Sequence, residues 1–447
     1  MIKIMIPNNF IPERSYVIDI LLGEMAGLEY GISISTSPDY QLLLPNGKRL
    51  IIRDHFFANF DEANSYLFLQ NIPATVPYVT HRFTDGLAVP MIYGDHELKV
   101  EPHVITCGLD IFASAFFMLS RWEECVVKAE DYHRRFPVSA ALAFKNGFLN
   151  KPVVNFYLVM LRCMLEYLGY YHEKAGVSFS FVLTHDVDAL LKWLDWSHVW
   201  RTISGDLFKR HQLGLSIQRL QEFRAIRQGK QPDPFDSYDL LMDEAELLGT
   251  RARFYFMSSR PSRAFEDNHS PYSPFHSGAQ RIFARIKSRG HIIGFHPGYT
   301  TYNNKELWQV QRAVLQNASG CLITEGRQHY LRFQVPDTWQ LWADMGMVLD
   351  STCAYSACEG FRCGTGHTYS VFNILTRQKL KLKEQPLIFM DTATNTTGWE
   401  PNSPTLNTLF SLIETARNVD TPITLLFHNS TFADQSVLPA YQKIIHS

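Results

Sequence analysis

The feature that most constrains the fold is a regular alternation of short apolar runs with longer amphipathic runs beyond residue 176. Short runs rich in β-branched and aromatic residues predict strands, and apolar residues three or four apart predict helices. Alternation of this kind is typical of a parallel α/β sheet or barrel. The predicted strands cover residues 179–184, 251–257, 291–296, 386–391 and 422–428, and the predicted helices cover 237–249, 278–290 and 335–346.

The segment before residue 176 has a different pattern. Short strand-like runs separated by turns come first, and two helical patterns follow at 109–124 and 153–171. A chain of 447 residues accommodates two domains of ordinary size. We therefore expect a smaller α/β domain over residues 1–175, without catalytic residues, and a second domain over residues 176–447.

Composition excludes several classes of protein. Apolar residues make up 46% of the chain and charged residues 19%, which is typical of a globular protein and not of a disordered one. With 42 basic and 44 acidic side chains the net charge is −2, which argues against nucleic acid as a partner. The oligomeric state is left open by these numbers.

Localisation signals are lacking in the sequence. No apolar stretch approaches the length of a membrane span, and the first apolar run ends at Pro7, too early for a secretory signal. The seven cysteines are an odd number in a long chain, which argues against a disulfide framework. We expect a cytoplasmic protein with reduced thiols.

Two aspartates follow the first predicted strand of the second domain, in the run Thr-His-Asp-Val-Asp at 184–188. Because residues two apart in an extended segment face the same side, Asp186 and Asp188 can converge on one site. Two adjacent carboxylates repel unless a cation or a proton lies between them. One can therefore bind a metal while the other acts as a base; the alternative is that both cap the following helix.

Two histidines end other predicted strands. His296 is followed by Pro-Gly, which holds it on a tight loop and suits a metal ligand. His428 ends the last apolar strand, where an imidazole can give or take a proton near neutral pH. Either histidine alone is weak evidence. Together with the aspartates they mark three strand ends, which is where parallel α/β enzymes carry their chemistry.

The order Asp-x-Asp, His-Pro, arginine, Leu-x-His resembles the polysaccharide deacetylase (NodB-homology) family of metal-dependent carbohydrate esterases and amidases. The segments that carry the resemblance are 184–188, 293–300, 329–333 with 345–352, and 425–428, within about residues 177–435. The resemblance implies a distorted (β/α) barrel. The first part of the chain resembles the uncharacterised N-terminal domain that precedes divergent deacetylase domains in some bacterial proteins.

The resemblance also implies roles for particular residues. It makes Asp186 the general base, His428 the general acid and Arg332 the arginine that orients the base, with Arg362 as a second candidate for that charge. Asp188 and His296 become ligands of a divalent metal, expected to be zinc. The implied substrate-binding residues are Asp391, Trp399 and Tyr299.

One position departs from the family pattern. The second metal histidine would stand four residues after His296, where this chain has Thr300. One aspartate and one histidine are too few protein ligands for strong zinc binding. Another residue completes the set, or the metal binds weakly, or catalysis has been lost. The candidates for the missing ligand are Asn303, Asn304, His185 and His329.

The function implied by the resemblance is metal-assisted hydrolysis of an acetamide on an N-acetylated sugar or polysaccharide precursor, which makes an N-acetylated carbohydrate the expected partner. Two alternatives stay open. One is a degenerate deacetylase fold that binds a glycan or partner enzymes. The other is an amidase that acts on another small molecule with a C–N bond.

The basic stretch and three of the cysteines each have a purely structural and a functional interpretation. The basic stretch at 208–230 is expected to be a solvated insertion helix, and the alternative is a surface for an acidic polymer or a membrane. Cys353, Cys358 and Cys363 are expected to be buried or incidental, and the alternative is a thiolate metal site.

Overall fold

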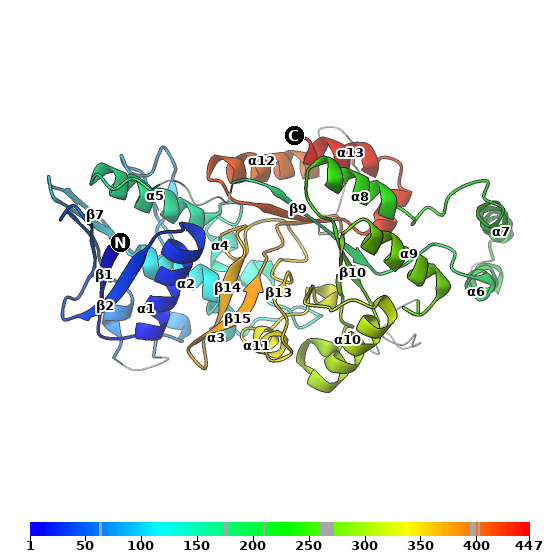
Figure 1. Ribbon diagram of the computed structural model, residues 1–447, viewed down its shortest axis with the longest axis horizontal. Helices are drawn as coiled ribbons and strands as arrows, with labels where there is room; N and C mark the ends of the chain where they lie inside the picture. The colour runs from blue at the N-terminus through cyan, green and yellow to red at the C-terminus, as the bar shows by residue number, and fades with distance from the viewer. Residues whose placement is uncertain (62–64, 173–177, 209–210, 259–271, 394–398, 401–402) are drawn as a thin grey trace. The chain divides into compact units, whose positions relative to one another are not determined.

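The computed structural model describes residues 1–61, 65–172, 178–208, 211–258, 272–393, 399–400 and 403–447 (Figure 1). It divides into two compact units. Unit 1 comprises residues 1–181, 330–395 and 407–424, and unit 2 comprises residues 182–329, 396–406 and 425–447.

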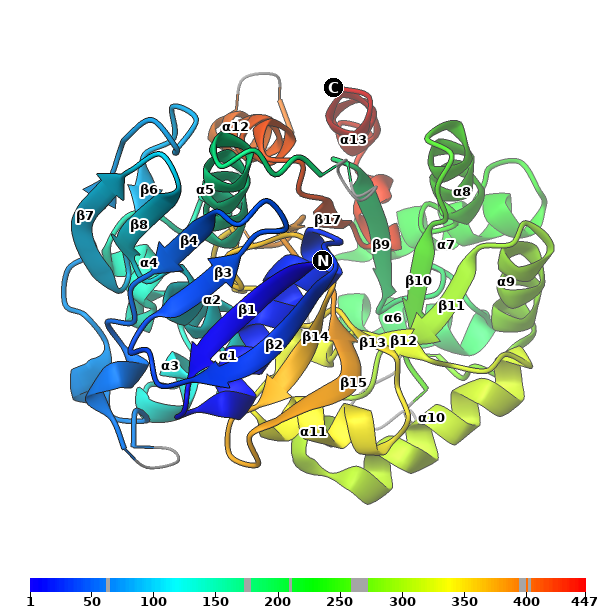
Figure 2. The same cartoon turned by 60° about the vertical axis from the view of Figure 1, so that its left-hand side comes forward.

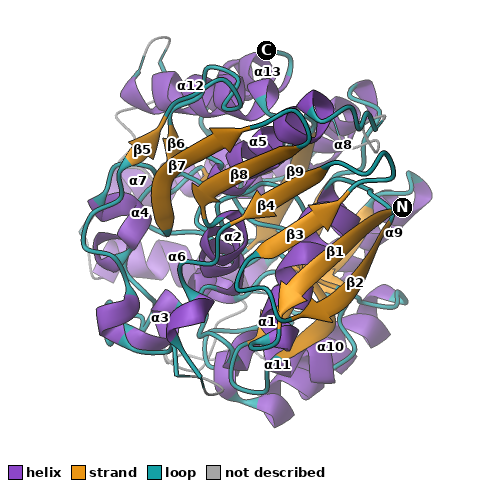
Figure 3. Ribbon diagram, turned by 90° about the vertical axis from the view of Figure 1, so that its left-hand side faces the viewer, coloured by secondary structure: helices purple, strands orange, loops and turns teal. Residues whose placement is uncertain are grey.

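Unit 1 contains a six-stranded mixed sheet in the order β2-β1-β3-β4-β8-β7, which Figure 3 shows with helices behind it. The pairs β1–β2 and β4–β8 are parallel, while β1–β3, β3–β4 and β7–β8 are antiparallel. Residues 2, 4 and 6 of the first strand are fully buried isoleucines, the alternation expected of a strand with one covered face. The strands are β1 (Ile2–Pro7), β2 (Tyr30–Ser35), β3 (Tyr40–Leu43), β4 (Arg49–Ile52), β7 (Gly94–Val100) and β8 (Val104–Leu109).

Helix α2 (Ile111–Ser120) is the centre of unit 1. All ten of its residues are buried, as expected for a helix that is apolar on every side. Asp110 caps it: Oδ1 accepts the N–H of Ala113 at 3.0 Å, and Oδ2 accepts the N–H of His55 at 2.9 Å. The other helices in the first part of the chain are α1 (Ile11–Ile18), α3 (Glu123–Val126), α4 (Leu142–Lys145) and α5 (Val153–Tyr167).

The described strands β1 to β8 pair only among themselves, in the six-stranded sheet and in a ribbon of β5 (Tyr78–Val79) and β6 (Val89–Pro90). Unit 1 is nevertheless larger than the predicted first domain, because later segments join it. The domain boundary at residue 175 therefore stays a prediction. The later elements are α11 (Asp337–Asp344), β13 (Leu349–Asp350), β14 (Tyr369–Asn373), β15 (Gln378–Glu384), β16 (Phe389–Met390) and the larger part of α12 (Pro404–Asn418).

Unit 2 is built on a parallel sheet in which β9 pairs with β10, β10 with β11 and β11 with β12. Figure 2 shows β9, β10 and β11 side by side, with α8 and α9 beside them. The last strand, β17 (Ile423–Leu426), adjoins β9, and the N–H of Phe427 donates to the carbonyl of Thr184 at 3.2 Å. The strands are β9 (Phe181–Val187), β10 (Arg253–Phe256), β11 (Ile292–Phe295) and β12 (Glu325–Gly326), and the main helices are α8 (Tyr238–Leu247), α9 (Ser277–Ser288), α10 (Lys305–Ser319) and α13 (Val437–Ile445).

The expectation of a (β/α) barrel is corrected by the sheet topology. A barrel requires every strand to pair on both edges. In unit 2 the order β12-β11-β10-β9-β17 does not return to its beginning, and β12 is only two residues long. No sheet formed by the described strands closes on itself. The fold is mixed α/β with open sheets, and the strand–helix alternation predicted for the second half is present in unit 2.

A helical insertion separates β9 from α8. It consists of α6 (Trp196–Phe208) and α7 (Leu213–Arg227), which pack on each other around Trp193, Val199, Ile203 and Phe223. Among the described residues, no helix combines the length and the apolar character needed to cross a bilayer.

Candidate metal centre and active site

The end of β9 supplies the first residues of the site. Thr184 and Asp186 are two apart in an extended strand, so their side chains lie on the same side, and both are buried. Asp188 follows directly after the last residue of the strand. The backbone pairing of Tyr255 with Asp186 places β10 beside this segment.

Arg327 holds Asp186 in place. Its Nη1 donates to Asp186 Oδ1 at 2.8 Å, and its Nη2 donates to Thr184 Oγ1 at 3.0 Å. The guanidinium is fully buried and the carboxylate nearly so. A charged, fork-shaped donor fixed on two neighbouring acceptors leaves the Asp186 carboxylate little freedom to rotate.

The arginine that contacts Asp186 is thus Arg327, and the roles predicted for Arg332 and Arg362 stay predictions. The guanidinium Nε of Arg332 donates to the carbonyl of His133 at 2.9 Å, in unit 1. The second candidate, Arg362, also lies in unit 1, where Nε and Nη2 bind the carboxylate of Glu124 at 2.9 and 2.5 Å. In the segment 329–333, which carries the resemblance, the residues from His329 to Leu331 form a turn, and the strand β12 ends earlier, at Gly326. The arginine at the end of the actual strand is Arg327.

His296 follows β11 and points one ring nitrogen at the aspartates. Its Nδ1 lies 2.7 Å from the carbonyl oxygen of Arg327; because a carbonyl only accepts, Nδ1 carries the proton in this bond. In the neutral ring this leaves the lone pair on Nε2, which lies 3.3 Å from Asp188 Oδ1 and 3.8 Å from Asp186 Oδ2. Burial alone would lower the pKa of His296, but the charges of Asp186 and Asp188 outweigh it and the pKa is raised.

His329 brings a second imidazole to the same point. Its Nε2 lies 3.7 Å from Asp188 Oδ1, and its ring centroid is 4.9 Å from that of His296. Burial lowers the pKa of His329 to about 4, despite the nearby charge of Asp188. The ring is therefore neutral at pH 7, which is the form that binds metals.

These three residues fit a divalent cation. The candidate ligand atoms of Asp188, His296 and His329 all lie within 4.8 Å of one another. Oδ1 of Asp188 is buried and makes no hydrogen bond of good geometry, although the two imidazole nitrogens converge on it. Burial opposes ionisation of Asp188, but the adjacent imidazoles hold its pKa well below the usual range. Two histidines and one carboxylate form a common three-residue ligand set for a metal that keeps an open position.

The other candidates for the missing ligand lie elsewhere. His185 points its Nδ1 at the carbonyl of Phe427, 2.8 Å away, and packs on the ring of Phe254. Asn304 caps α10 by accepting the N–H of Leu307 at 2.9 Å, and Asn303 is exposed in a short 3-10 turn. Of the four residues that the sequence suggested, His329 is the one that reaches Asp188.

His428 lies on the other side of the Asp188 carboxylate. Its Nε2 is 3.7 Å from Asp188 Oδ2, whereas the ring nitrogens of His296 and His329 approach Oδ1. The side chain is 14% exposed, so it is accessible to a small molecule. The structure brings His428 into the same cluster as Asp186, Asp188 and His296; its role as an acid stays a prediction.

Of the three predicted substrate-binding residues, Trp399 and Tyr299 lie in unit 2 and Asp391 lies in unit 1. The ring of Trp399 packs 5.3 Å from the ring of Phe427, the residue before His428. Tyr299 is half-buried in the turn after His296. Asp391 is buried in unit 1, in the turn that follows β16. Substrate contacts of all three stay predictions.

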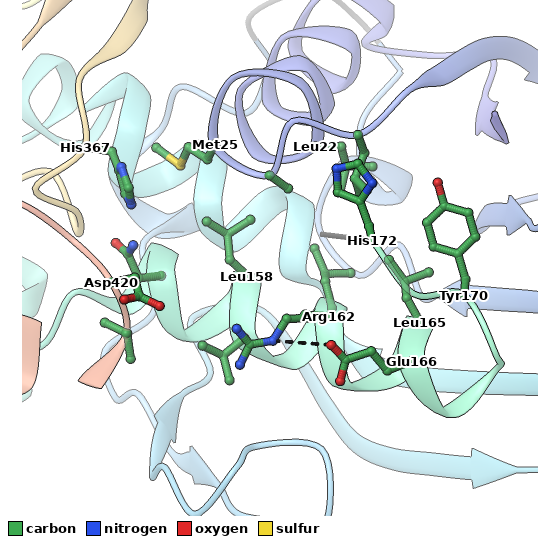
Figure 4. A pocket seen from close by; sticks show the side chains of 16 residues that line it. Leu22, Met25, Leu158, Arg162, Leu165, Glu166, Tyr170, His172, His367 and Asp420 are labelled. Carbon is green, nitrogen blue, oxygen red and sulfur yellow. Dashed lines mark ion pairs between the residues drawn. The ribbon is translucent and has the colours of Figure 1, made fainter. Parts of the chain in front are cut away.

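A separate pocket of about 120 Å³ lies within unit 1 (Figure 4). Leu22, Met25, Leu158 and Leu165 give it apolar walls. His367 and Asp420 lie at one side of it, and Arg162 and Glu166 form a loose ion pair of 3.8 Å at its edge.

Cys353, Cys358 and Cys363, the candidates for a thiolate site, all lie in unit 1. All seven thiols are free, and Cys353 and Cys363 are buried. In the part of the chain that the structure describes, the three thiols do not form a metal-binding cluster of three ligands; Asp188, His296 and His329 do.

A family model described as "Family of unknown function (DUF7033)" matches residues 2–169. No curated protein matches the chain.

Two solved structures are similar at low identity. A putative polysaccharide deacetylase from Mycobacterium smegmatis shares 13% identity with a TM-score of 0.39, over 62% of this chain and 85% of its own. The polysaccharide deacetylase Bc1974 from Bacillus cereus shares 11% identity with a TM-score of 0.26, over 60% of this chain and 87% of its own. Because these scores are low, the assignment of chemistry depends on the residues of the site.

Proposed function

We propose that the protein is a metal-dependent hydrolase that removes an N-acetyl group from a sugar or a polysaccharide precursor. The observation that carries the proposal is the arrangement of side chains around Asp188. The imidazoles of His296 and His329 converge on its Oδ1, and the imidazole of His428 approaches its Oδ2. Asp186, hydrogen-bonded to Arg327, lies beside them. The resemblance of the motifs to polysaccharide deacetylases supports the choice of substrate class.

The ligand set is Asp188, His296 and His329, with zinc as the expected cation. When bound, such an ion supplies a Lewis acid that polarises a carbonyl and lowers the pKa of water. His296 is oriented for this purpose by the carbonyl of Arg327, which keeps the proton on Nδ1. In this ligand set His329 takes the place of the histidine that the family carries at the position of Thr300, so the site keeps three protein ligands.

Asp186 is the general base of the proposed reaction. Its Oδ1 is occupied by Arg327, while Oδ2 faces His296 and thus the ligand set. Oδ2 can therefore take the proton from a water molecule that attacks the acetyl carbonyl. The fixed orientation of the carboxylate means that no rotation has to precede the proton transfer.

His428 is the general acid. Its imidazole stands across the Asp188 carboxylate from His296, so base and acid approach the reacting centre from different elements, β9 and the end of β17. A protonated His428 gives its proton to the departing nitrogen, which leaves as an amine. Base and acid need opposite protonation states at one pH, which a carboxylate and an imidazole provide.

The test combines metal analysis with acetate release from N-acetylated oligosaccharides. We expect Asp186→Asn to lower kcat about a hundredfold or more with the metal content unchanged, since a base is lost but no ligand. His329→Ala should lower both the metal content and the rate. The exposed His211, replaced by Ala, serves as the matched control.

Two results would contradict the proposal. One is full metal content in the His329→Ala protein, which would remove this residue from the ligand set. The other is the absence of acetate release from any N-acetylated oligosaccharide by the metal-loaded wild-type protein, which would exclude this substrate class.

A further inference from the structure

The insertion between β9 and α8 carries an unusual surface. We call residues 193–232 the α6–α7 hairpin. In the sequence it holds seven basic and three acidic side chains, a net charge of +4, although the whole chain carries −2. It also exposes large apolar side chains: Trp196 46%, Trp200 62%, Phe208 79%, Leu213 64% and Ile217 50%. Exposed apolar groups at this density mark an interaction surface.

The hairpin is antiparallel and has its own small core. Trp196 lies at the start of α6 and Phe223 near the end of α7, and the centroids of their rings are 4.6 Å apart. At the end of the hairpin next to β9, the carboxylate of Asp233 accepts hydrogen bonds from the N–H groups of Lys192 and Trp193, at 2.9 Å each. These bonds join the segment before α6 to the segment after α7. Figure 1 shows the two helices as a pair set apart from α8 and α9. The exposed residues therefore do not belong to the core of unit 2.

Several of the exposed apolar and basic residues share one face of the hairpin. Four of them directly follow a residue that packs between α6 and α7: Trp200 follows Val199, Phe208 follows Leu207, Arg224 follows Phe223 and Arg227 follows Ile226. Ile217 likewise follows the buried Ser216. One position is about 100° around a helix. In two antiparallel helices that pack along a common seam, the same rotation away from the seam leads to the same side of the pair. The exposed residues of α6 and those of α7 therefore lie next to each other on one face.

This combination fits the surface of an anionic lipid bilayer. Tryptophan and phenylalanine favour the boundary between headgroups and acyl chains, and leucine and isoleucine add buried apolar area. Arg224, Arg227 and Lys230 are exposed at the same end of α7, where they can pair with lipid phosphates. A second copy of the hairpin is a poor occupant, because two faces of net positive charge repel each other.

We propose that the α6–α7 hairpin binds the protein to anionic membrane surfaces. It begins five residues after Asp188, so the segment that anchors the protein to a bilayer follows directly from the strand that carries the candidate catalytic aspartates. A substrate attached to a lipid would then be held near the site. The inference depends on the hairpin alone and not on the reaction proposed above.

The experiment is co-sedimentation of the full-length protein with vesicles. Vesicles of phosphatidylcholine mixed with phosphatidylglycerol are compared with vesicles of phosphatidylcholine alone, at low and at high salt. We expect binding to the mixed vesicles that weakens with salt. The pair Trp200→Ser and Phe208→Ser, and the pair Arg224→Glu and Arg227→Glu, should each lower the partition coefficient about tenfold or more.

The matched control replaces an exposed leucine and an exposed lysine on other helices of unit 2, Leu247→Ser with Lys305→Glu, and should bind like the wild type. Circular dichroism and acetate release from a soluble oligosaccharide show whether the hairpin variants keep their fold and their site. Three results overturn the proposal: no binding to either kind of vesicle, equal binding to neutral vesicles, or self-association of the protein without lipid that the same substitutions abolish.

Discussion

Arg327 connects the two halves of the candidate chemistry. Its side chain donates to Asp186 and Thr184, and its carbonyl oxygen accepts a hydrogen bond from Nδ1–H of His296. One residue thus orients both the proposed base and a proposed metal ligand. A lysine at this position keeps the positive charge, but its ammonium is a point charge that lacks the planar fork needed to hold two acceptors in a fixed orientation.

We predict that Arg327→Lys lowers kcat about a hundredfold, because the Asp186 carboxylate gains rotational freedom. The metal content should stay at the wild-type level, since the carbonyl that orients His296 belongs to the backbone. The control is Arg332→Lys, whose guanidinium contacts the carbonyl of His133. A normal rate in the first variant together with a reduced rate in the second would restore Arg332 to the role first predicted for it.

At the scale of elements, the close approach of β11 and β12 positions the ligands. The two strands pair at Phe295 and Gly326, directly before His296 and Arg327. A Cβ atom built on Gly326 would lie 2.0 Å from the carbonyl oxygen of Phe295, far inside van der Waals contact. Only glycine allows this spacing, and the spacing brings His296 and Arg327 together.

Gly326→Ala should therefore separate the two strands. The expected costs are about 1–3 kcal/mol of unfolding free energy, by analogy with overpacked cores, and a weaker metal site. Gly214→Ala is the control, because the Cβ there meets nothing within 4 Å and the position lies in α7. That substitution should leave stability unchanged or raise it. Urea unfolding and metal titration measure both effects; unchanged values for Gly326→Ala would show that the strands can separate at no cost.

At the scale of the whole molecule, buried histidines link stability to pH. Burial lowers the pKa of His367 to about 4, although Asp420 nearby opposes the shift. In the unfolded chain a histidine has a pKa of about 6.5. Between these values the unfolded state binds more protons than the folded state, so the free energy of unfolding falls as the pH falls.

We predict that acidification from pH 7 to pH 5 removes about 2 kcal/mol of stability through His367. The contribution is present above pH 6.5 and is lost as the pH falls toward 4. His367→Gln, which cannot become charged, should flatten the dependence of the urea midpoint on pH. The exposed His103, replaced by Gln, is the control. An equal slope in the wild type and His367→Gln would mean that the pKa of His367 is the same in the folded and the unfolded state.

Much of the candidate site follows from local sequence patterns. Strand periodicity and the polar residues that follow each strand are properties of short segments, and they were sufficient to select Asp186, Asp188, His296 and His428. The structure brings all four together in unit 2. His329, whose Nε2 the structure places 3.7 Å from Asp188 Oδ1, was among the four candidates for the missing ligand.

Other features depended on contacts between distant segments. Whether Arg327 or Arg332 meets Asp186 is decided by where β12 ends and by the turn after it, in which Tyr330 and Leu331 have positive φ angles of 58° and 52°. Whether the sheet closes depends on strand pairing along its whole width, which no single segment encodes. Local burial patterns determine the elements, because they depend on neighbours in the chain; register, turn geometry and sheet closure decide which side chains meet, because they depend on all the elements at once.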